Sequence, residues 1–360
     1  MSKPTFSICI PNYNYARFIG DTIQSVLDQT YSHFEIIVVD NASTDNSIEV
    51  VEKFQDERIR LIKNRYNIGF APNLQRATMY ANYDFINLLS SDDRLKPDAL
   101  ETYAEVLRSR GDRASRTVLM SDVEVIDSGG DPLYTIATDI DSYESAVGGY
   151  ADDGLNNTLE VTVLRGHDVL ATTLRQLRTF APFLSIVYPK VLWKAIEGYN
   201  SVRTVGPDKH FNYKLLSQDP DIVYVRKTLF EYRVHQSPNE KAQQQTLKRQ
   251  IDDYLYTTEF SDDFLASLGL LRDDLVRALL DNVCLKNGLT QLVYGTYTQA
   301  VRMLAFSFAS YPKETLKRPR AYVLATLLML GPIGKIIAKP LYALYRRLNG
   351  TGERFRKIKA

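Results

Sequence analysis

Short apolar runs alternate with helical patterns over the first hundred residues. The runs at 6–10, 34–39 and 85–89 are rich in Ile, Val and Leu and are predicted to be buried strands. Apolar residues spaced along one face in 21–29 and 48–54 predict helices between them. Strands that alternate with helices predict a mostly parallel sheet with right-handed crossovers. The pattern therefore predicts an α/β fold with helices flanking the sheet.

Polar residues follow each predicted strand at once. Asp40 ends the second run, and Asp92-Asp93 follows the third. Ligands of such sheets bind beyond the carboxyl ends of the strands, and two adjacent carboxylates repel each other unless a cation lies nearby. Magnesium and manganese bind one or two carboxylates together with substrate phosphates. We therefore expect Mn2+ or Mg2+ and a phosphorylated ligand here; the alternative is a solvated turn that caps a helix starting near Pro97.

Five ordered blocks in the first hundred residues resemble the family 2 glycosyltransferases, which are inverting enzymes with the GT-A fold. The blocks are Ser7–Asn14, Ser25–Tyr31, Glu35–Asp45, Asn67–Gly69, and Ser91–Asp93 followed by Pro97. The resemblance weakens from about residue 110 to 240 and ends there. It implies a nucleotide-diphospho-sugar transferase with a Rossmann-like sheet, similar to enzymes of bacterial surface-polysaccharide assembly.

The resemblance assigns a nucleotide site to the first part of the chain. Pro11 and Tyr13 would line the pocket, with the Tyr13 ring against the base. Asp40 would accept a hydrogen bond from a uracil or thymine ring N–H. Asn67 and Gly69 would complete the site, where the backbone at Gly69 could pass close to the diphosphate, although a plain turn explains this glycine equally well.

The resemblance also assigns the metal and diphosphate contacts. Asp93 would ligate the ion, and Asp92 would contact the ribose or a metal-bound water. In the block Phe230–Ser237, Arg233 could pair with the diphosphate, and His235 could ligate the metal or bond the diphosphate. The ion would neutralise the departing nucleoside diphosphate.

Asp208 is the predicted catalytic base, which an inverting transfer needs to deprotonate the acceptor hydroxyl. In the family this base follows a Gly-aromatic step by about ten residues, and here Gly198-Tyr199 precedes Asp208 at that spacing. Pro207 stands where the family usually has an acid, which is a departure from the pattern. The alternative is an acidic residue at a helix N-terminus after a Gly-Pro turn.

The chain is predicted to have three parts. Residues 1–240 would form the catalytic domain, with a nucleotide half at 1–110 and an acceptor half at 111–240. A long loop or irregular hairpin at 128–160 could cover a substrate. Residues 241–312 would be a helical extension, and residues 313–360 would be a basic amphipathic tail.

The last 48 residues are strongly basic, whereas the chain as a whole is nearly neutral. Residues 313–360 hold twelve Lys or Arg and two Glu, whereas the net charge of the chain is +1. Basic residues alternate with apolar ones around 335–347, a pattern typical of a helix at a membrane interface. The alternatives are a core-packing helix with a solvated tail, or oligomerisation.

The expected function is transfer of a sugar from a nucleoside-diphosphate sugar, most simply a UDP-sugar, to a hydroxyl of a glycan or lipid-linked glycan. Two rivals remain: a catalytically inactive glycan- or nucleotide-binding module on the same fold, and a sugar-phosphate nucleotidyltransferase, whose Gly-rich loop is missing after the first strand. Two cysteines and no apolar leader predict a cytoplasmic protein, peripheral on the inner face of the membrane. No nucleic-acid partner is expected.

Overall fold

A computed structural model describes residues 3–138, 140, 159–200, 206–235, 247–348 and 355–359, with only the backbone for 345–348 and 355–359. The amino-terminal elements are β1 (Phe6–Asn12), α1 (Ile19–Leu27), β2 (Phe34–Asp40), α2 (Ser47–Glu52), β3 (Ile59–Lys63), α3 (Phe70–Met79), β4 (Phe85–Leu88), β5 (Arg94–Leu95) and α4 (Ala99–Arg110). The middle elements are β6 (Thr117–Ile126), β7 (Pro132–Thr138), β8 (Val161–Arg165), α6 (Gly166–Leu174), β9 (Val187–Pro189), α7 (Lys190–Ala195), α8 (Pro207–Ser217) and β10 (Asp221–Arg233).

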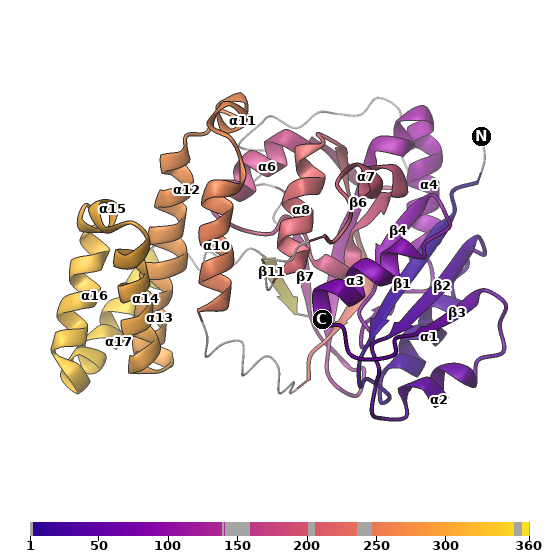
Figure 1. Ribbon diagram of the computed structural model, residues 1–360, viewed down its shortest axis with the longest axis horizontal. Coiled ribbons are helices and arrows are strands. Elements are labelled where there is room, and N and C mark those ends of the chain that lie inside the picture. The colour runs from indigo at the N-terminus through magenta and orange to yellow at the C-terminus, as the bar shows by residue number, and fades with distance from the viewer. Residues whose placement is uncertain are drawn as a thin grey trace.

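The carboxyl-terminal third is mostly helical, as its sequence pattern predicts. Its elements are α10 (Lys248–Glu259), α11 (Asp262–Ser267), α12 (Arg272–Ala278), a π-helical segment (Leu279–Leu285), α13 (Lys286–Tyr294), α14 (Tyr297–Ser310), α15 (Pro312–Leu316), α16 (Pro319–Met329), α17 (Gly331–Leu348) and β11 (Phe355–Lys359). Figure 1 shows α13–α17 at the opposite end of the molecule from β1–β3.

Within the described residues, eleven strands form one mixed sheet. Its main path runs β11-β7-β6-β9-β4-β1-β2-β3, and β10 pairs with β5, β6 and β8. Strand β1 is parallel to both β2 and β4, which confirms the parallel arrangement predicted for the first three apolar runs. The ends of these strands therefore lie at one edge of the sheet, where their polar residues meet.

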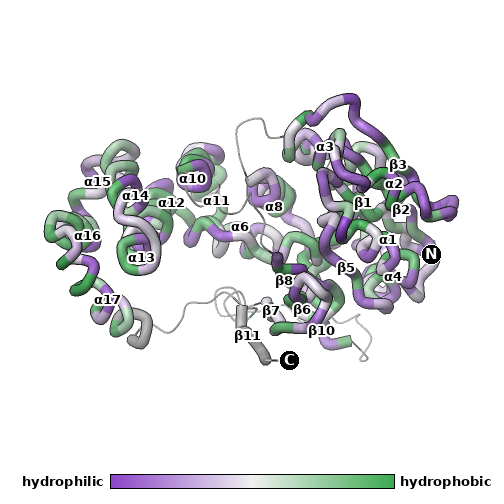
Figure 2. Tube along the Cα trace, turned by 90° about the horizontal axis from the view of Figure 1, so that it is seen from below, coloured by the Kyte–Doolittle hydropathy of each residue, from purple (hydrophilic) through white to green (hydrophobic). Residues whose placement is uncertain are grey.

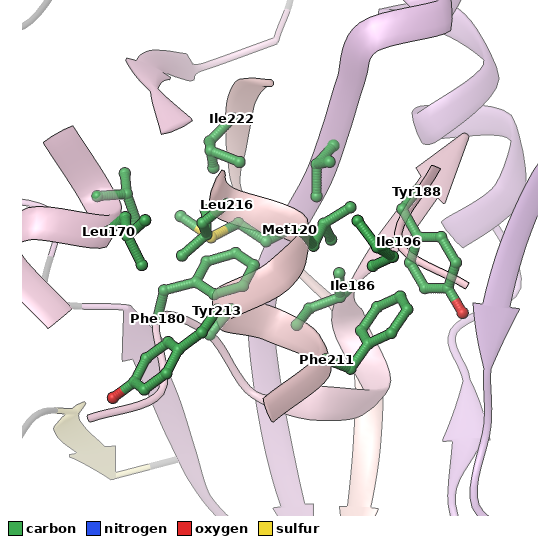
Figure 3. Packing of buried hydrophobic residues seen from close by; sticks show 14 of the residues in the cluster. Met120, Leu170, Phe180, Ile186, Tyr188, Ile196, Phe211, Tyr213, Leu216 and Ile222 are labelled. Carbon is green, nitrogen blue, oxygen red and sulfur yellow. The ribbon is translucent and has the colours of Figure 1, made fainter. Parts of the chain in front are cut away.

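Two hydrophobic cores cover the two faces of the sheet, because successive side chains of a strand point to opposite faces. In β1, Ile8 and Ile10 pack into one core with α1, α2 and α4, whereas Cys9 packs into the other. The second core takes in α3, α6 and α8 (Figure 3). Cys9 and Cys284 are both buried and free, as expected for a chain without a disulfide framework.

The helical extension contributes to two different cores. Leu275, Leu279 and Cys284 belong to the same core as α3, α6 and α8. A third core is built by Leu285, at the end of the π-helical segment, together with α13, α14, α16 and α17. The extension is joined to the sheet domain up to the π-helical segment, and Phe306 of α14 also packs against the core shared with the sheet.

The stretch from 128 to 160 is only partly described. Pro132–Thr138 forms β7, which pairs antiparallel with β6 and has a register shift between Val125 and Ile126, so the described part of this stretch is an irregular hairpin, as expected. Residues 139 and 141–158, where a substrate-covering loop was predicted, lie outside the described residues. In the tail, β11 pairs antiparallel with β7, a strand that the basic composition of the tail did not suggest.

Candidate active site

A cavity of about 260 Å3 lies beyond the carboxyl ends of β1, β4 and β10. Its walls come from five separate parts of the chain, which the fold brings together. The lining residues are Pro11, Tyr15, Phe70, Leu74, Ser90, Ser91, Asp92, Phe183, Tyr232, Arg233, Val234 and His235. Four of the predicted site residues, at positions 11, 92, 233 and 235, are therefore brought to one cavity at the sheet edge that the strand pattern indicated.

Asp92 and His235 are in direct contact in the wall of this cavity. The Nε2 atom of His235 lies 2.9 Å from Oδ2 of Asp92. Burial raises the pKa of Asp92, although the interaction with His235 opposes that effect. The ring of His235 is fixed by Phe18 and Tyr15, whose ring centroids lie 5.0 and 5.8 Å from its own.

Asp93 lies beneath the cavity and is 1% exposed. Its Oδ1 accepts a hydrogen bond of 2.9 Å from the backbone N–H of Arg233. Burial raises the pKa of Asp93 well above its ordinary value, and the neighbouring charge of Asp92 raises it further. Two buried carboxylates that repel each other are stabilised by a positive charge between or beside them.

The side chains of Asp92, Asp93 and His235 could serve as ligands of a divalent ion. Among the described residues, no three His, Cys, Asp or Glu side chains are grouped as a ready-made metal site. Mg2+ and Mn2+ do not need such a cage, because they bind through one or two carboxylates and complete their shell with water and substrate phosphates. The donor chemistry of Asp92, Asp93 and His235 is compatible with that mode of binding.

Arg233 contacts both residues of the acidic pair, Asp92 and Asp93. Its Nε donates to the backbone carbonyl of Asp92 at 2.9 Å, and a terminal nitrogen lies 3.5 Å from Oδ2 of Asp21 on α1. The guanidinium also lies over the Phe18 ring, 5.1 Å from its centroid. Burial lowers the pKa of Arg233. These contacts tie β10 to α1 and to the loop after β4, and the predicted contact of Arg233 with a diphosphate stays a prediction.

Asp40 ends β2 one strand away and is buried. Its Oδ1 accepts a hydrogen bond of 2.7 Å from Nδ2 of Asn12 at the end of β1. Both carboxylate oxygens also bond Ser43, through its hydroxyl at 2.5 Å and its backbone N–H at 2.9 Å. The predicted hydrogen bond from a nucleobase would have to use the lone pairs of the Asp40 carboxylate that these contacts leave free. Tyr13, the other residue predicted for the base, is 39% exposed and does not line the cavity.

Asn67 and Gly69 form the turn that starts α3. The Oδ1 atom of Asn67 accepts hydrogen bonds from Nδ2 of Asn41 at 2.9 Å and from the Gly69 N–H at 2.8 Å. Gly69 has a φ of 91°, a left-handed conformation that favours glycine. This turn places Phe70 and Leu74 of α3 in the cavity wall.

Asp208 lies in the first turn of α8, directly after Pro207, and does not line the cavity. Burial raises its pKa, while Lys209 acts in the opposite direction. The charge of Asp208 acts on Tyr199, and the Tyr199 ring lies 6.4 Å from the ring of Phe183, which does line the cavity. The candidate base is therefore outside the cavity wall, and residues 201–205, which precede it in the sequence, lie outside the described structure.

The Gly198-Tyr199 step that precedes the candidate base is fixed on α3. The Tyr199 N–H donates to Oε1 of Gln75 at 2.6 Å. Gly198 has a φ of 64°, and a Cβ there would lie 2.5 Å from both Gln75 and Trp193. The glycine is therefore required twice, once for its backbone conformation and once for space.

Sequence reasoning missed most of the cavity wall. Asn12, Asn41 and Ser43 do not line the cavity but hydrogen-bond Asp40 or Asn67. They are polar residues at strand ends, so the pattern that identified Asp40 could have included them. The aromatic walls had no such signal: Phe183 reaches the cavity only through the tertiary fold, about ninety residues after the acidic pair.

Comparison with known proteins locates the family likeness in the first third of the chain. Residues 7–116 match the family described as glycosyl transferase family 2. A putative teichuronic acid biosynthesis glycosyltransferase, TuaG of Bacillus subtilis, is 37% identical over 110 residues, which are 30% of this chain and 44% of TuaG. The Escherichia coli UDP-Glc:alpha-D-GlcNAc-diphosphoundecaprenol beta-1,3-glucosyltransferase WfgD is 44% identical over 87 residues, which are 24% of this chain and 34% of WfgD. Each alignment spans less than half of the relative.

The likeness in structure extends much further than the likeness in sequence. The structure of residues 1–349 of S. aureus TarS in complex with UDP-GlcNAc aligns with a TM-score of 0.58 and 16% identity, covering 93% of this chain and 89% of the other. The GT-A fold predicted from the sequence motifs is confirmed, and the helical region that follows the sheet is part of the shared architecture.

Proposed function

Starting from a glycosyl transferase family 2 domain over residues 7–116, we propose that the protein is an inverting glycosyltransferase. It would transfer a sugar from a nucleoside diphosphate to a hydroxyl of a glycan or lipid-linked glycan in cell-surface polysaccharide synthesis. The observation that carries the proposal is the cavity beyond β1, β4 and β10, with Asp92 in its wall and Asp93 beneath it.

A UDP-sugar is the proposed donor. The names of WfgD and of the TarS complex include UDP-Glc and UDP-GlcNAc, and Asp40 can accept a hydrogen bond from a uracil N–H. Pro11, Tyr13, Asn67 and Gly69 would hold the nucleoside part, and Asp92 would contact the ribose or a metal-bound water. Arg233, already engaged with the backbone of Asp92, would contribute positive charge beside the diphosphate.

Asp93 and His235 would hold Mn2+ or Mg2+, with Asp92 beside them. The bound ion would neutralise charge on the departing nucleoside diphosphate. The protein would contribute the fixed placement of these donors: His235 orients the Asp92 carboxylate, and the Arg233 N–H orients that of Asp93.

Asp208 would take the proton from the acceptor hydroxyl. As that proton moves to the Asp208 carboxylate, the acceptor oxygen would bond to the anomeric carbon of the donor sugar. The bond from that carbon to the diphosphate would break on the opposite face, which inverts the configuration. A carboxylate whose pKa is raised by burial is a stronger base than an ordinary aspartate, which suits this role.

A membrane surface is the proposed partner of the tail. Among the described residues, no helix combines the length and apolar character needed to cross a bilayer. Helix α17 instead bears both hydrophobic and hydrophilic residues along its length (Figure 2), with Ile333, Ile336 and Leu344 more than half exposed and Lys335 and Lys339 between them. This pattern suits a helix lying on an anionic surface, where a lipid-linked acceptor would be presented.

The test is transfer from UDP-sugars in the presence of Mn2+, followed by release of UDP. Chelation of the metal, or the substitution Asp93→Asn, is expected to lower turnover by at least about 100-fold, because metal stabilisation of a leaving group contributes several kcal/mol. Full activity under either condition would eliminate the metal role. Release of pyrophosphate from UTP and a sugar 1-phosphate, without transfer from UDP-sugars, would identify a nucleotidyltransferase. UDP binding without turnover would identify an inactive binding module.

A further inference from the structure

The first turn of α8, which carries the candidate base, is held by helix α10. Oδ2 of Asp252 accepts a hydrogen bond of 2.8 Å from the backbone N–H of Gly206. Asp252 is 4% exposed, and the Tyr256 hydroxyl donates to the carbonyl oxygen of the same glycine at 3.5 Å. Both backbone groups of Gly206, at the N-cap of α8, are therefore bonded by one neighbouring helix.

The contacts continue along the same side of α10. Lys209 forms an ion pair with Asp253, and Nε2 of His210 lies 3.1 Å from Oε1 of Glu259. Lys209 also donates to the carbonyl oxygen of Leu177 at 2.6 Å, which ties the turn to the end of α6. Gly206, two residues before Asp208, and Lys209 and His210, which follow it, are thus fixed by polar bonds to elements outside α8.

The rest of α8 is held in a different way. Phe211, Tyr213 and Leu216 point into the core between the sheet and α6 (Figure 3), and the rings of Tyr213 and Tyr256 lie 5.0 Å apart. Apolar packing sets the axis of the helix but leaves the direction of its first turn to hydrogen bonds, since the first amides of a helix have no partner within it.

The carboxylates of Asp252 and Asp208 both lie close to Gly206. A Cβ at Gly206 would lie 3.4 Å from Oδ1 of Asp208 and 3.6 Å from Oδ2 of Asp252. The carboxylate that anchors the turn and the carboxylate that would do the chemistry are therefore on adjoining sides of one residue. Because a hydrogen bond from a backbone amide to an ionised carboxylate is among the stronger kinds, loss of Asp252 releases the turn that aims Asp208.

We propose that Asp252 is a positioning residue for Asp208, so that helix α10, which follows the sheet domain in sequence, is a working part of the active site. The inference rests on the proposed function, since it assigns Asp208 the part of the base. The Gly206 amide must be hydrogen-bonded for the Asp208 carboxylate to reach the acceptor hydroxyl. A displacement of about 1 Å in a reacting group can lower the rate roughly 100-fold.

The experiment compares Asp252→Ala, Asp252→Asn and the control Asp263→Ala, which removes an exposed carboxylate of the next helix. Hydrogen exchange is followed in the full chain by mass spectrometry in peptides covering 206–212, and kcat and KM are measured with a UDP-sugar. Asp252→Ala is expected to speed exchange in 206–212 at least tenfold and to lower kcat roughly 10- to 100-fold. Affinity for UDP should stay within about twofold.

The conservative variant separates positioning from charge. Asn at position 252 can still accept the Gly206 N–H, so Asp252→Asn should recover most of the lost kcat and of the exchange protection, whereas Asp263→Ala should behave as the wild type. Unchanged exchange in 206–212, an unchanged kcat, or a loss of UDP affinity as large as the loss of kcat would each overturn the proposal. A wild-type chain that transfers no sugar contradicts the proposed function instead, and the exchange measurement still decides whether Asp252 holds the turn.

Discussion

The imidazole of His235 lies 2.9 Å from the Asp92 carboxylate, although 143 positions separate the two residues in the sequence. This contact joins the end of β10 to the end of β4 and places the only histidine of the cavity wall against the acidic pair. The ring is held by Phe18, so its position is set by packing before any ligand binds. The acidic pair therefore has an imidazole nitrogen in a fixed position beside it.

Substitution of His235 by Ala is expected to lower activity or metal affinity by about 10- to 100-fold, the usual cost of removing a group that holds or orients a metal ligand. The measurement is kcat/KM for the UDP-sugar as a function of Mn2+ concentration. His33→Ala is the matched control, because His33 lies before β2 against the Tyr31 ring, away from the cavity. Equal activity of the two variants would show that His235 serves packing alone.

Gly198 and Gly269 have similar backbone conformations but differ in the room that each leaves for an added Cβ. Their φ angles are 64° and 66°, but an added Cβ would lie 2.5 Å from Trp193 at the first and would meet nothing within 4 Å at the second. Gly269→Ala should cost only the left-handed strain of about 1–2 kcal/mol. Gly198→Ala should lower the free energy of unfolding by at least a further ~1 kcal/mol, since the crowded site must shift. Urea denaturation of both variants checks the difference, and equal losses would contradict it.

The sequence allowed the sheet edge to be predicted, but not the layers behind it. Asp40, Asp92 and Asp93 could be placed because each follows an apolar run, and parallel strands bring their ends to one edge. Arg233 and His235 came from a resemblance, and their bonds to Asp92 and Asp93 depend on the pairing of β10 with β5 and β6, which no local pattern encodes.

The bond between Asp252 and Gly206 was equally invisible in the sequence, because it joins two helices 46 positions apart. Apolar periodicity identifies the buried face of a helix but does not say which polar side chain meets a given backbone amide. The helical extension was predicted as an appendage for this reason, whereas Leu275 and Leu279 share a core with α8.

Glu35 provides a test of stability against pH. Burial opposes its ionisation, but hydrogen bonds from Ser7 and Asn82 outweigh that effect and lower its pKa. The folded protein therefore holds the Glu35 proton less tightly than the unfolded chain, so the stabilisation is present above the unfolded pKa of about 4.3 and is lost as the pH falls through the folded value.

Glu35→Gln should accordingly lower the free energy of unfolding by roughly 1–3 kcal/mol at pH 7, the cost of a weakened buried network. The difference from the wild type should shrink as the pH is lowered from 7 to about 3, because protonation of Glu35 then becomes progressively more favourable. Glu52→Gln is the control, because the Glu52–Lys63 pair is about half exposed and such pairs contribute about 0–1 kcal/mol. Urea titrations at both pH values decide, and a difference that stays constant with pH would contradict the prediction.

The membrane partner of α17 is best tested by substitution, because deletion of 313–360 would also remove Leu324 and Leu328 from the third core. Ile336→Asn removes a side chain that is 70% exposed, and Val191→Asn removes one that is 56% exposed on the distant helix α7. If α17 inserts its apolar side into a bilayer surface, Ile336→Asn should lower flotation with anionic liposomes by several-fold, since each buried methylene contributes about 0.8 kcal/mol. Val191→Asn should leave it unchanged. Binding should also fall with added salt, because attraction between basic residues and anionic lipids is screened; equal flotation of both variants would favour a protein partner for α17.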